Sequence, residues 1–211
     1  FSYIEDFTNE IQDKLYSEDF ADPSSENYYG NYLDVDSFID WWIVEEIAKN
    51  TDSNFFSSCY MYFDPQDQKL HMGPLWDFDL GFGNNGNTTI SKQTGFLADI
   101  AGALVNENNV PYAKRANWIC RLREDSAFVE KINQRWNSVR ADVENYFAND
   151  FVSNLESIKN DAELNFVRWP ILGESVWNVP SGFETRTTYD SEIDYFNNWF
   201  KNRMVWLDSN F

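Results

Sequence analysis

The chain has 211 residues, of which 43% are apolar and 18% aromatic, so it can build one sizeable hydrophobic core and is not a disordered chain. Its formal net charge of -19 at pH 7 repels nucleic acids and anionic membranes, which excludes both as default partners. Two cysteines and one histidine exclude a disulfide framework and a zinc site made of several thiolates or histidines, and no apolar run reaches the length of a membrane span.

The N-terminal quarter is predicted to hold two helices separated by a loop. Apolar residues recur at helical spacing over residues 2–20, and turn-forming residues follow over 21–32. Residues 34–50 form the most apolar helix candidate, with Asp34 or Asp36 as its N-cap. Because apolar side chains cover most of its circumference, this helix is predicted to lie in the centre of the core.

A β-hairpin is predicted after this central helix. Residues 59–64 and 69–80 are both rich in strand-forming residues, and a short polar turn joins them. A loop rich in glycine and asparagine follows over residues 81–89.

The remainder is predicted to be helical. Spacings of three and four recur up to the C-terminus, and one long loop at residues 170–188 interrupts them. The fold class is therefore predicted as α+β, mainly α, with one inserted β-hairpin. The expected helices are 96–107, 111–126, 127–147, 151–169 and 189–210.

Acidic residues around the hairpin are the first candidates for a functional site. Asp77 and Asp79 lie in GPLWDFDLGFGNNG between aromatic residues and glycines, where burying an unpaired carboxylate would be costly. Asp52 follows the central helix, and the hairpin that separates it from Asp77 doubles back. The exit of the hairpin therefore returns close to its entry, and the two acids are predicted to face one solvent-accessible site. Gly81 and Gly83 would let the backbone approach that site or adopt a positive φ.

This arrangement suits metal-assisted phosphoryl transfer, in which one carboxylate positions an attacking hydroxyl and the other holds Mg²⁺. The ordinary alternative, favoured on spacing alone, is that Asp77 and Asp79 cap turns and that Asp52 is a turn residue at a helix end. A calcium loop is a third option, but the sequence does not contain the EF-hand pattern.

Five segments, in order along nearly the whole chain, resemble the spore-coat CotH kinase-like family. They are DVDSFIDWWIVEEIAKNTDS, SSCYMYFD, KLHMGPLWDFDLGFGN, RWPILGE and EIDYFNNWFKNRMVWLDSNF. The most specific feature is GPLWDFDLGFGN followed by a terminal W…R…WLD. The resemblance implies an atypical protein kinase that uses ATP with Mg²⁺ or Mn²⁺ to phosphorylate Ser or Thr of secreted or surface proteins.

The resemblance also implies roles for the acids. Asp52 would occupy the catalytic aspartate position. Asp77 would be the metal aspartate, the counterpart of the acid in the D-F-G motif of protein kinases. Asp79 lies where relatives have Asp or Asn, and it is assigned to the metal as well.

Five further residues are assigned by resemblance to cofactor binding. Asn54, Ser57 and Ser58 fall where a second polar Mg²⁺ ligand would lie, and Gly81 and Gly83 complete the set. A protein kinase would carry Asn at the position of Ser57, and a hydroxyl is a weaker Mg²⁺ ligand than an amide carbonyl.

The resemblance covers only part of a kinase. No glycine cluster and no strand-borne lysine precede Asp52. Residues 1–211 are therefore expected to be the C-terminal lobe of a CotH-like kinase domain, inactive as this fragment and located outside the cell or on its surface. The alternative is a non-catalytic binding or structural module of a larger extracellular or carbohydrate-associated assembly, with Trp177, Tyr28 and Tyr29 lining a sugar-binding surface.

Two further predictions concern the core. Glu46 is an acid among hydrophobic residues, so it is predicted to be buried and paired with an arginine. Five tryptophans in helical patterns are predicted to pack in the core: Trp118, Trp136, Trp169, Trp199 and Trp206.

Overall fold

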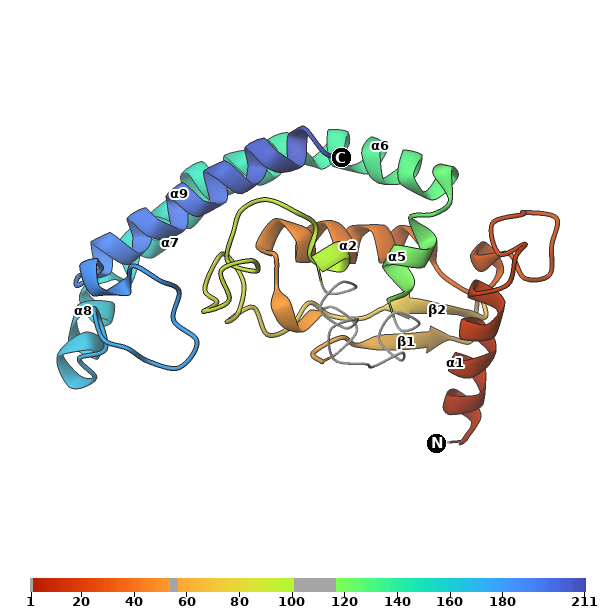
Figure 1. Ribbon diagram of the computed structural model, residues 1–211, viewed down its shortest axis with the longest axis horizontal. Coiled ribbons are helices and arrows are strands. Elements are labelled where there is room, and N and C mark those ends of the chain that lie inside the picture. The colour runs from red at the N-terminus through yellow and green to blue at the C-terminus, as the bar shows by residue number, and fades with distance from the viewer. Residues whose placement is uncertain (1, 54–56, 101–116) are drawn as a thin grey trace.

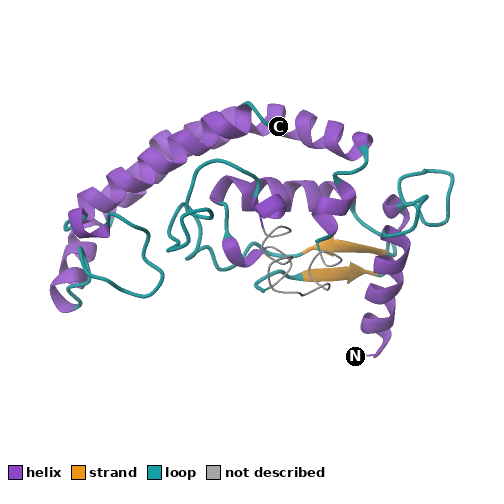
Figure 2. Ribbon diagram, viewed as in Figure 1, coloured by secondary structure: helices purple, strands orange, loops and turns teal. Residues whose placement is uncertain are grey.

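Helices make up most of the structure. The computed structural model describes residues 2–53, 57–100 and 117–211, and within them it has one antiparallel hairpin (Figure 2). The predicted fold class, mainly α with a small hairpin, is thereby confirmed. The strands are β1 (Met61–Asp64) and β2 (Lys69–Met72). The helices are α1 (Ser2–Leu15), α2 (Val35–Ala48), α5 (Trp118–Leu122), α6 (Ser126–Asn145), the π-helical η3 (Tyr146–Phe151), α7 (Val152–Ser157), α8 (Lys159–Arg168) and α9 (Tyr189–Asp208). Short 3₁₀ turns are η1 (Tyr29–Asn31), η2 (Thr51–Ser53) and η4 (Phe183–Thr185).

Helix α2 lies at the centre of the molecule, as its apolar circumference predicts. It begins at Asp34, whose side chain accepts a hydrogen bond from the Ser37 N–H at 2.9 Å, so Asp34 and not Asp36 is the N-cap. Figure 1 shows the hairpin on one side of α2 and the long helices α6 and α9 on the other. Nine of its residues are buried: Phe38, Ile39, Trp41, Trp42, Ile43, Glu45, Glu46, Ile47 and Ala48.

The second strand is shorter than predicted. The hairpin pairs Met61 with Met72 and continues to the turn, but the ladder does not extend to residue 80. The Gly73 N–H still donates to the Tyr60 carbonyl at 2.6 Å. Pro74 then has no N–H to offer, so the chain leaves the sheet and approaches the end of α2 as an irregular segment.

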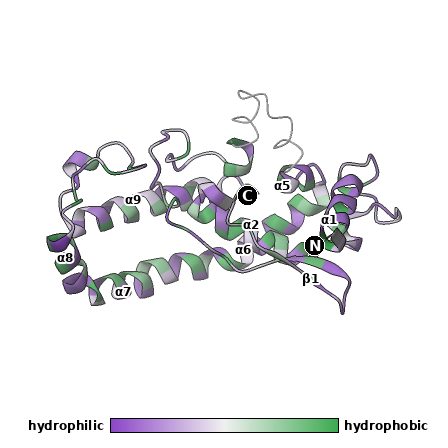
Figure 3. Cartoon of the chain, turned by 90° about the horizontal axis from the view of Figure 1, so that it is seen from below, coloured by the Kyte–Doolittle hydropathy of each residue, from purple (hydrophilic) through white to green (hydrophobic). Residues whose placement is uncertain are grey.

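The C-terminal helices form a long layer, and α6 and α9 of this layer contribute buried residues to the core. Helices α6 and α7 are joined through η3 into one long helical stretch. Figure 3 shows this stretch and α9 running along the molecule. Aromatic rings connect them: Phe147 stacks on Phe200 with ring centroids 4.0 Å apart. The helix predicted over 151–169 is interrupted at Ile158, which separates α7 from α8. No helix of the described residues is both long enough and apolar enough to cross a membrane.

Two of the predicted helices lie partly outside the described residues. The structure has helical residues at 97–100, at the start of the helix predicted over 96–107, and α5 near the end of the helix predicted over 111–126. A break at Arg123–Asp125 separates α5 from α6. The predicted division of the helical region is therefore only approximate.

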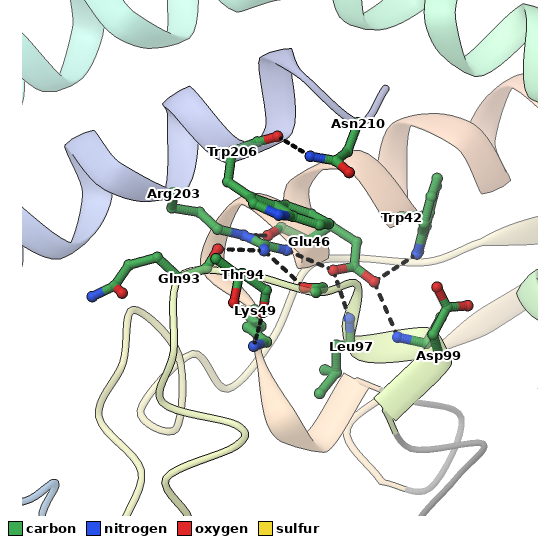
Figure 4. A network of polar contacts seen from close by, with 12 residues as sticks. Trp42, Glu46, Lys49, Gln93, Thr94, Leu97, Asp99, Arg203, Trp206 and Asn210 are labelled. Carbon is green, nitrogen blue, oxygen red and sulfur yellow. Dashed lines mark hydrogen bonds and ion pairs between the residues drawn. The ribbon is translucent and has the colours of Figure 1, made fainter.

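The predicted partner of Glu46 is Arg203 of α9. An Oε2···Nη2 distance of 2.8 Å joins these two buried side chains (Figure 4). Glu46 also accepts hydrogen bonds from the Trp42 indole and from the N–H groups of Leu97 and Ala98. A buried acid is stable only when its lone pairs are satisfied in this way, so the prediction of a paired structural acid is confirmed.

The tryptophan prediction is confirmed for three buried residues, Trp118, Trp136 and Trp199, and Trp206 packs against the core while partly buried. It is wrong for Trp169, which is 53% exposed. Trp169 ends α8, a helix without buried residues, and its ring is covered by the Arg168 guanidinium instead.

The expected sugar-binding surface is not formed as a unit. Tyr29 is 3% exposed, and its hydroxyl donates to the Asp125 carboxylate at 2.7 Å. Trp177 is 80% exposed. Tyr29 is therefore part of the core and offers no ring face to a sugar.

Candidate functional site

The end of α2 holds the acid-bearing segment, residues 77–82. The Phe82 N–H donates to the Ala48 carbonyl at 2.6 Å. The side-chain amide of Asn50 donates to the Asp77 carbonyl at 3.1 Å. These contacts attach the exit of the hairpin to the helix that precedes its entry, as the doubling back of the chain predicts.

Three carboxylates meet at this point. One carboxylate oxygen from each of Asp52, Asp77 and Asp79 lies within 4.8 Å of the other two. Asp52 is partly buried in η2, and Asp77 and Asp79 are exposed. Within the described residues, no lysine or arginine forms an ion pair with any of them. The structure thus brings the two predicted acids together with Asp79 at one solvent-accessible place.

The electrostatics of the cluster follow from this proximity. Partial burial raises the pKa of Asp52 above its ordinary value, and the negative charges of Asp77 and Asp79 raise it further. A hydrogen bond with the Ser57 side chain acts in the opposite direction. The fold therefore keeps three like charges close together without a basic side chain from the described residues to neutralise them.

The serines predicted to bind the cofactor lie next to the acids. The Ser58 hydroxyl donates to Oδ2 of Asp77 at 3.2 Å. The Ser57 N–H donates to the Asp52 carbonyl at 3.2 Å. Asn54 lies outside the described residues. The assignment of both serines to the cofactor stays a prediction.

The two glycines predicted to bind the cofactor have packing reasons for being glycine. Gly81 is buried, and a Cβ there would meet the Phe78 carbonyl and Ala48. Gly83 has φ +80°, and a Cβ there would overlap the indole of Trp199. Gly81 and Gly83 follow the acids along the chain, and their contact with a cofactor stays a prediction.

The aromatic residues of this segment have two different environments. Phe82 has φ +52°, which is rare for a bulky residue, and its ring packs against Phe196 and Trp199. Trp76 is 58% exposed and makes an edge contact with Tyr60. Phe82 therefore anchors the segment, while Trp76 lies at the surface immediately before Asp77.

The donor set fits a divalent cation. Carboxylate oxygens are among the ligands that Mg²⁺ and Mn²⁺ prefer, and the Ser58 hydroxyl adds a weaker one. Like charges this close repel one another unless a cation or water lies between them. Asp52, Asp77, Asp79 and Ser58 are thus suited to hold such an ion, and two of the acids are accessible to it.

A second group of possible metal ligands has a structural explanation. Oxygens of Asp34 and Asp67 lie within 4.8 Å of a ring nitrogen of His71. However, Nδ1 of His71 contacts the Asp34 carboxylate and Nε2 contacts the Asp67 carboxylate, so each ring nitrogen has a different acidic partner. Asp34 is already the N-cap of α2, and Asp67 accepts from the Lys69 N–H in the hairpin turn. This group attaches the hairpin to the start of α2.

Several residues that position the acids do not stand out in the sequence. Asn50 supports Asp77, and the Thr51 hydroxyl donates to the Leu80 carbonyl at 3.3 Å. Asn85 in turn donates to the Thr51 hydroxyl at 3.0 Å. The asparagine two residues before a catalytic candidate, at the end of a helix predicted to be buried, is a signal that could have identified this support, because a buried amide needs specific partners.

Comparisons with known proteins are consistent with this geometry. The searches of curated proteins and of solved structures returned no match. A family model described as CotH kinase protein matches residues 1–207, which is nearly the whole chain. The chain therefore belongs to the CotH kinase protein family.

Proposed function

We propose that this chain is the C-terminal lobe of a CotH-type atypical protein kinase that phosphorylates Ser or Thr hydroxyls of secreted or surface proteins. The observation that carries the proposal is the meeting of Asp52, Asp77 and Asp79 at the end of α2. Family membership supports a kinase-related function, and the order of helix, acidic turn, hairpin and second acid matches the order of catalytic parts in protein kinases.

The proposed roles follow from exposure and position. Asp77 and Asp79 are exposed and would hold Mg²⁺ or Mn²⁺, with the Ser58 hydroxyl orienting the Asp77 carboxylate. Bound Mg-ATP supplies the phosphoryl group and the charge neutralisation that its transfer requires. Ser57 holds the turn on which Asp52 lies.

Asp52 is proposed to accept the proton of the substrate hydroxyl. Its pKa is raised by burial and by the two neighbouring acids, which brings it closer to the working pH of a general base. It lies in η2 next to Thr51, whose hydroxyl donates to the Leu80 carbonyl, so the backbone that carries Asp52 is attached to the acid-bearing segment. Asp52 therefore differs from Asp77 in environment as well as in role.

Phosphoryl transfer is not expected from residues 1–211 alone. A kinase also needs a phosphate-covering glycine-rich loop and a phosphate-binding lysine, and no glycine cluster or strand-borne lysine occurs before Asp52. We further propose an extracellular or cell-surface location from the family relationship. The alternative function is a binding module of a larger extracellular assembly, which the exposed Trp177 would favour.

Mn²⁺ titration followed by electron paramagnetic resonance tests the metal assignment on which the proposal depends. We expect the wild-type chain to bind Mn²⁺. Asp77→Asn should lose most of the affinity. Asp142→Asn, which removes the same charge from an exposed position on α6, should keep it. Equal affinities in both variants would refute the metal assignment.

A further inference from the structure

Lys49 has an unusual conformation and an unusual burial. It ends α2 with φ +50° and ψ +49°, the left-handed conformation that glycine or asparagine usually provides at this position. Its side chain is only 1% exposed. A strained backbone conformation together with a buried charge, three residues before Asp52, indicates that this side chain has a specific task.

The left-handed turn directs the Lys49 side chain into the loop that follows the acids. Its Nζ donates to the carbonyls of Thr89, Lys92 and Thr94 at 3.3, 2.7 and 2.7 Å. An ammonium group has three donors, and here each has a backbone acceptor. Figure 4 shows Lys49 beside Thr94, close to the Glu46–Arg203 pair.

Two residues of α9 hold the same loop. Arg203 Nη1 donates to the carbonyls of Gln93 and Gly95, both at 2.8 Å. Trp199 Nε1 donates to the Ser91 carbonyl at 2.7 Å. The loop at 89–95 therefore depends on buried side-chain donors for six of its carbonyls, and Lys49 supplies three of them.

This loop is connected to the acid-bearing segment by Trp199. The indole N–H of Trp199 donates to the Ser91 carbonyl. The ring packs against Phe82, and it occupies the space that a side chain at Gly83 would need. The Phe82 N–H is bonded to the end of α2, one residue before Lys49. Trp199 is thus in direct contact both with the 89–95 loop and with the segment that carries Asp77.

We propose that Lys49 is a positioning residue for the acid cluster, because its ammonium group fixes the 89–95 loop and thereby holds the acid-bearing segment against the end of α2. The positioning of a metal site rests on the proposed function, but the fixing of the segment does not. Lys49 itself does not touch the metal or the substrate. It acts through the loop, Trp199 and Phe82.

Lys49→Met tests the proposal at pH 7, because it keeps the apolar stem and removes the ammonium group. We expect the amide hydrogen of Phe82 to exchange at least about tenfold faster and Mn²⁺ affinity to fall about tenfold. Lys201→Met removes the same charge from an exposed position on α9 and should change neither quantity. In Lys49→Ala, added propylammonium should restore both, because it can occupy the vacated place among the carbonyls.

The outcomes separate this proposal from the proposed function. If the wild type binds no Mn²⁺, the metal assignment fails, and hydrogen exchange at Phe82 alone decides the role of Lys49. Unchanged exchange in a folded Lys49→Met would overturn the positioning role. If Lys49→Met does not fold, Lys49→Gln decides instead, because its amide can still donate to part of the carbonyls of the loop but carries no ammonium group. Faster exchange at Phe82 supports the proposal, and unchanged exchange overturns it.

Discussion

Asp77→Asn is the most informative single change at the acid cluster. Asp77 has φ +65°, a left-handed conformation that aspartate and asparagine tolerate better than other side chains. Asparagine therefore removes the charge without changing the backbone preference. Alanine would add a conformational cost of about 1 kcal/mol at this position, which would confuse a metal effect with a folding effect.

The magnitude follows from the surroundings of the carboxylate. Without metal, Asp77→Asn should change the free energy of unfolding by less than about 1 kcal/mol, because the side chain is exposed and its charge repels Asp52 and Asp79. With Mg²⁺ at about 100 times its dissociation constant, the wild type should gain about 2.7 kcal/mol. For a chain of this size, that gain corresponds to a rise of roughly 5–11 °C in Tm.

Thermal unfolding with and without Mg²⁺ measures both quantities. We expect the wild type and Asp142→Asn to show the full Mg²⁺-dependent rise, and Asp77→Asn to show little of it. The reasoning is refuted if Asp77→Asn keeps the same rise. It is also refuted if the metal-free variant loses several kcal/mol, because Asp77 would then be a structural turn residue.

Four other experiments test the remaining arguments. Arg203→Met leaves Glu46 charged and buried, so it should cost about 3–5 kcal/mol in urea denaturation, and a loss below 1 kcal/mol would contradict the pairing. Gly83→Ala should cost about 2 kcal/mol in the same assay, because it combines a positive φ with overlap on Trp199, and a neutral result would show that the segment can move away. Because the pKa of Asp52 is raised in the folded state, its protonated form stabilises the fold below about pH 4, and this contribution is lost as pH rises through the raised pKa. The metal-free wild type should therefore lose stability relative to Asp52→Asn as pH approaches neutrality, and parallel pH profiles of the two proteins would exclude this. The 211-residue chain should transfer no radiolabelled phosphate from ATP to casein or to itself, and measurable transfer would show that no further lobe is needed.

The local elements could be predicted because their signals are local. The apolar circumference of α2, the short polar turn of the hairpin and the burial of Glu46 all follow from side-chain periodicity and from the cost of an unpaired charge. The proximity of Asp52 and Asp77 follows from the return of a hairpin to its origin. These inferences need no knowledge of distant contacts.

The support of the acid cluster could not be predicted, because it depends on tertiary contacts. Lys49 resembles an ordinary helix-end lysine in the sequence, yet its partners lie 40 to 45 residues further along the chain. Gly83 is predicted to allow a backbone approach or a positive φ, and its φ is +80°, but the Trp199 indole packed against it is a tertiary contact that the sequence does not indicate. Trp169 has helical spacing, but α8 contributes no buried residue, so periodicity alone overestimates its burial.

The anchoring of both hairpin ends on α2 makes the spacing of the acids independent of the hairpin's length. Asn50 and Ala48 fix the exit of the hairpin, and Asp52 lies at its entry. The tip around Pro65 and Gln66 is exposed and far along the chain from both anchors. Residues inserted there would lengthen the ribbon without separating the carboxylates, so the tip is a natural place for a fluorophore or affinity tag.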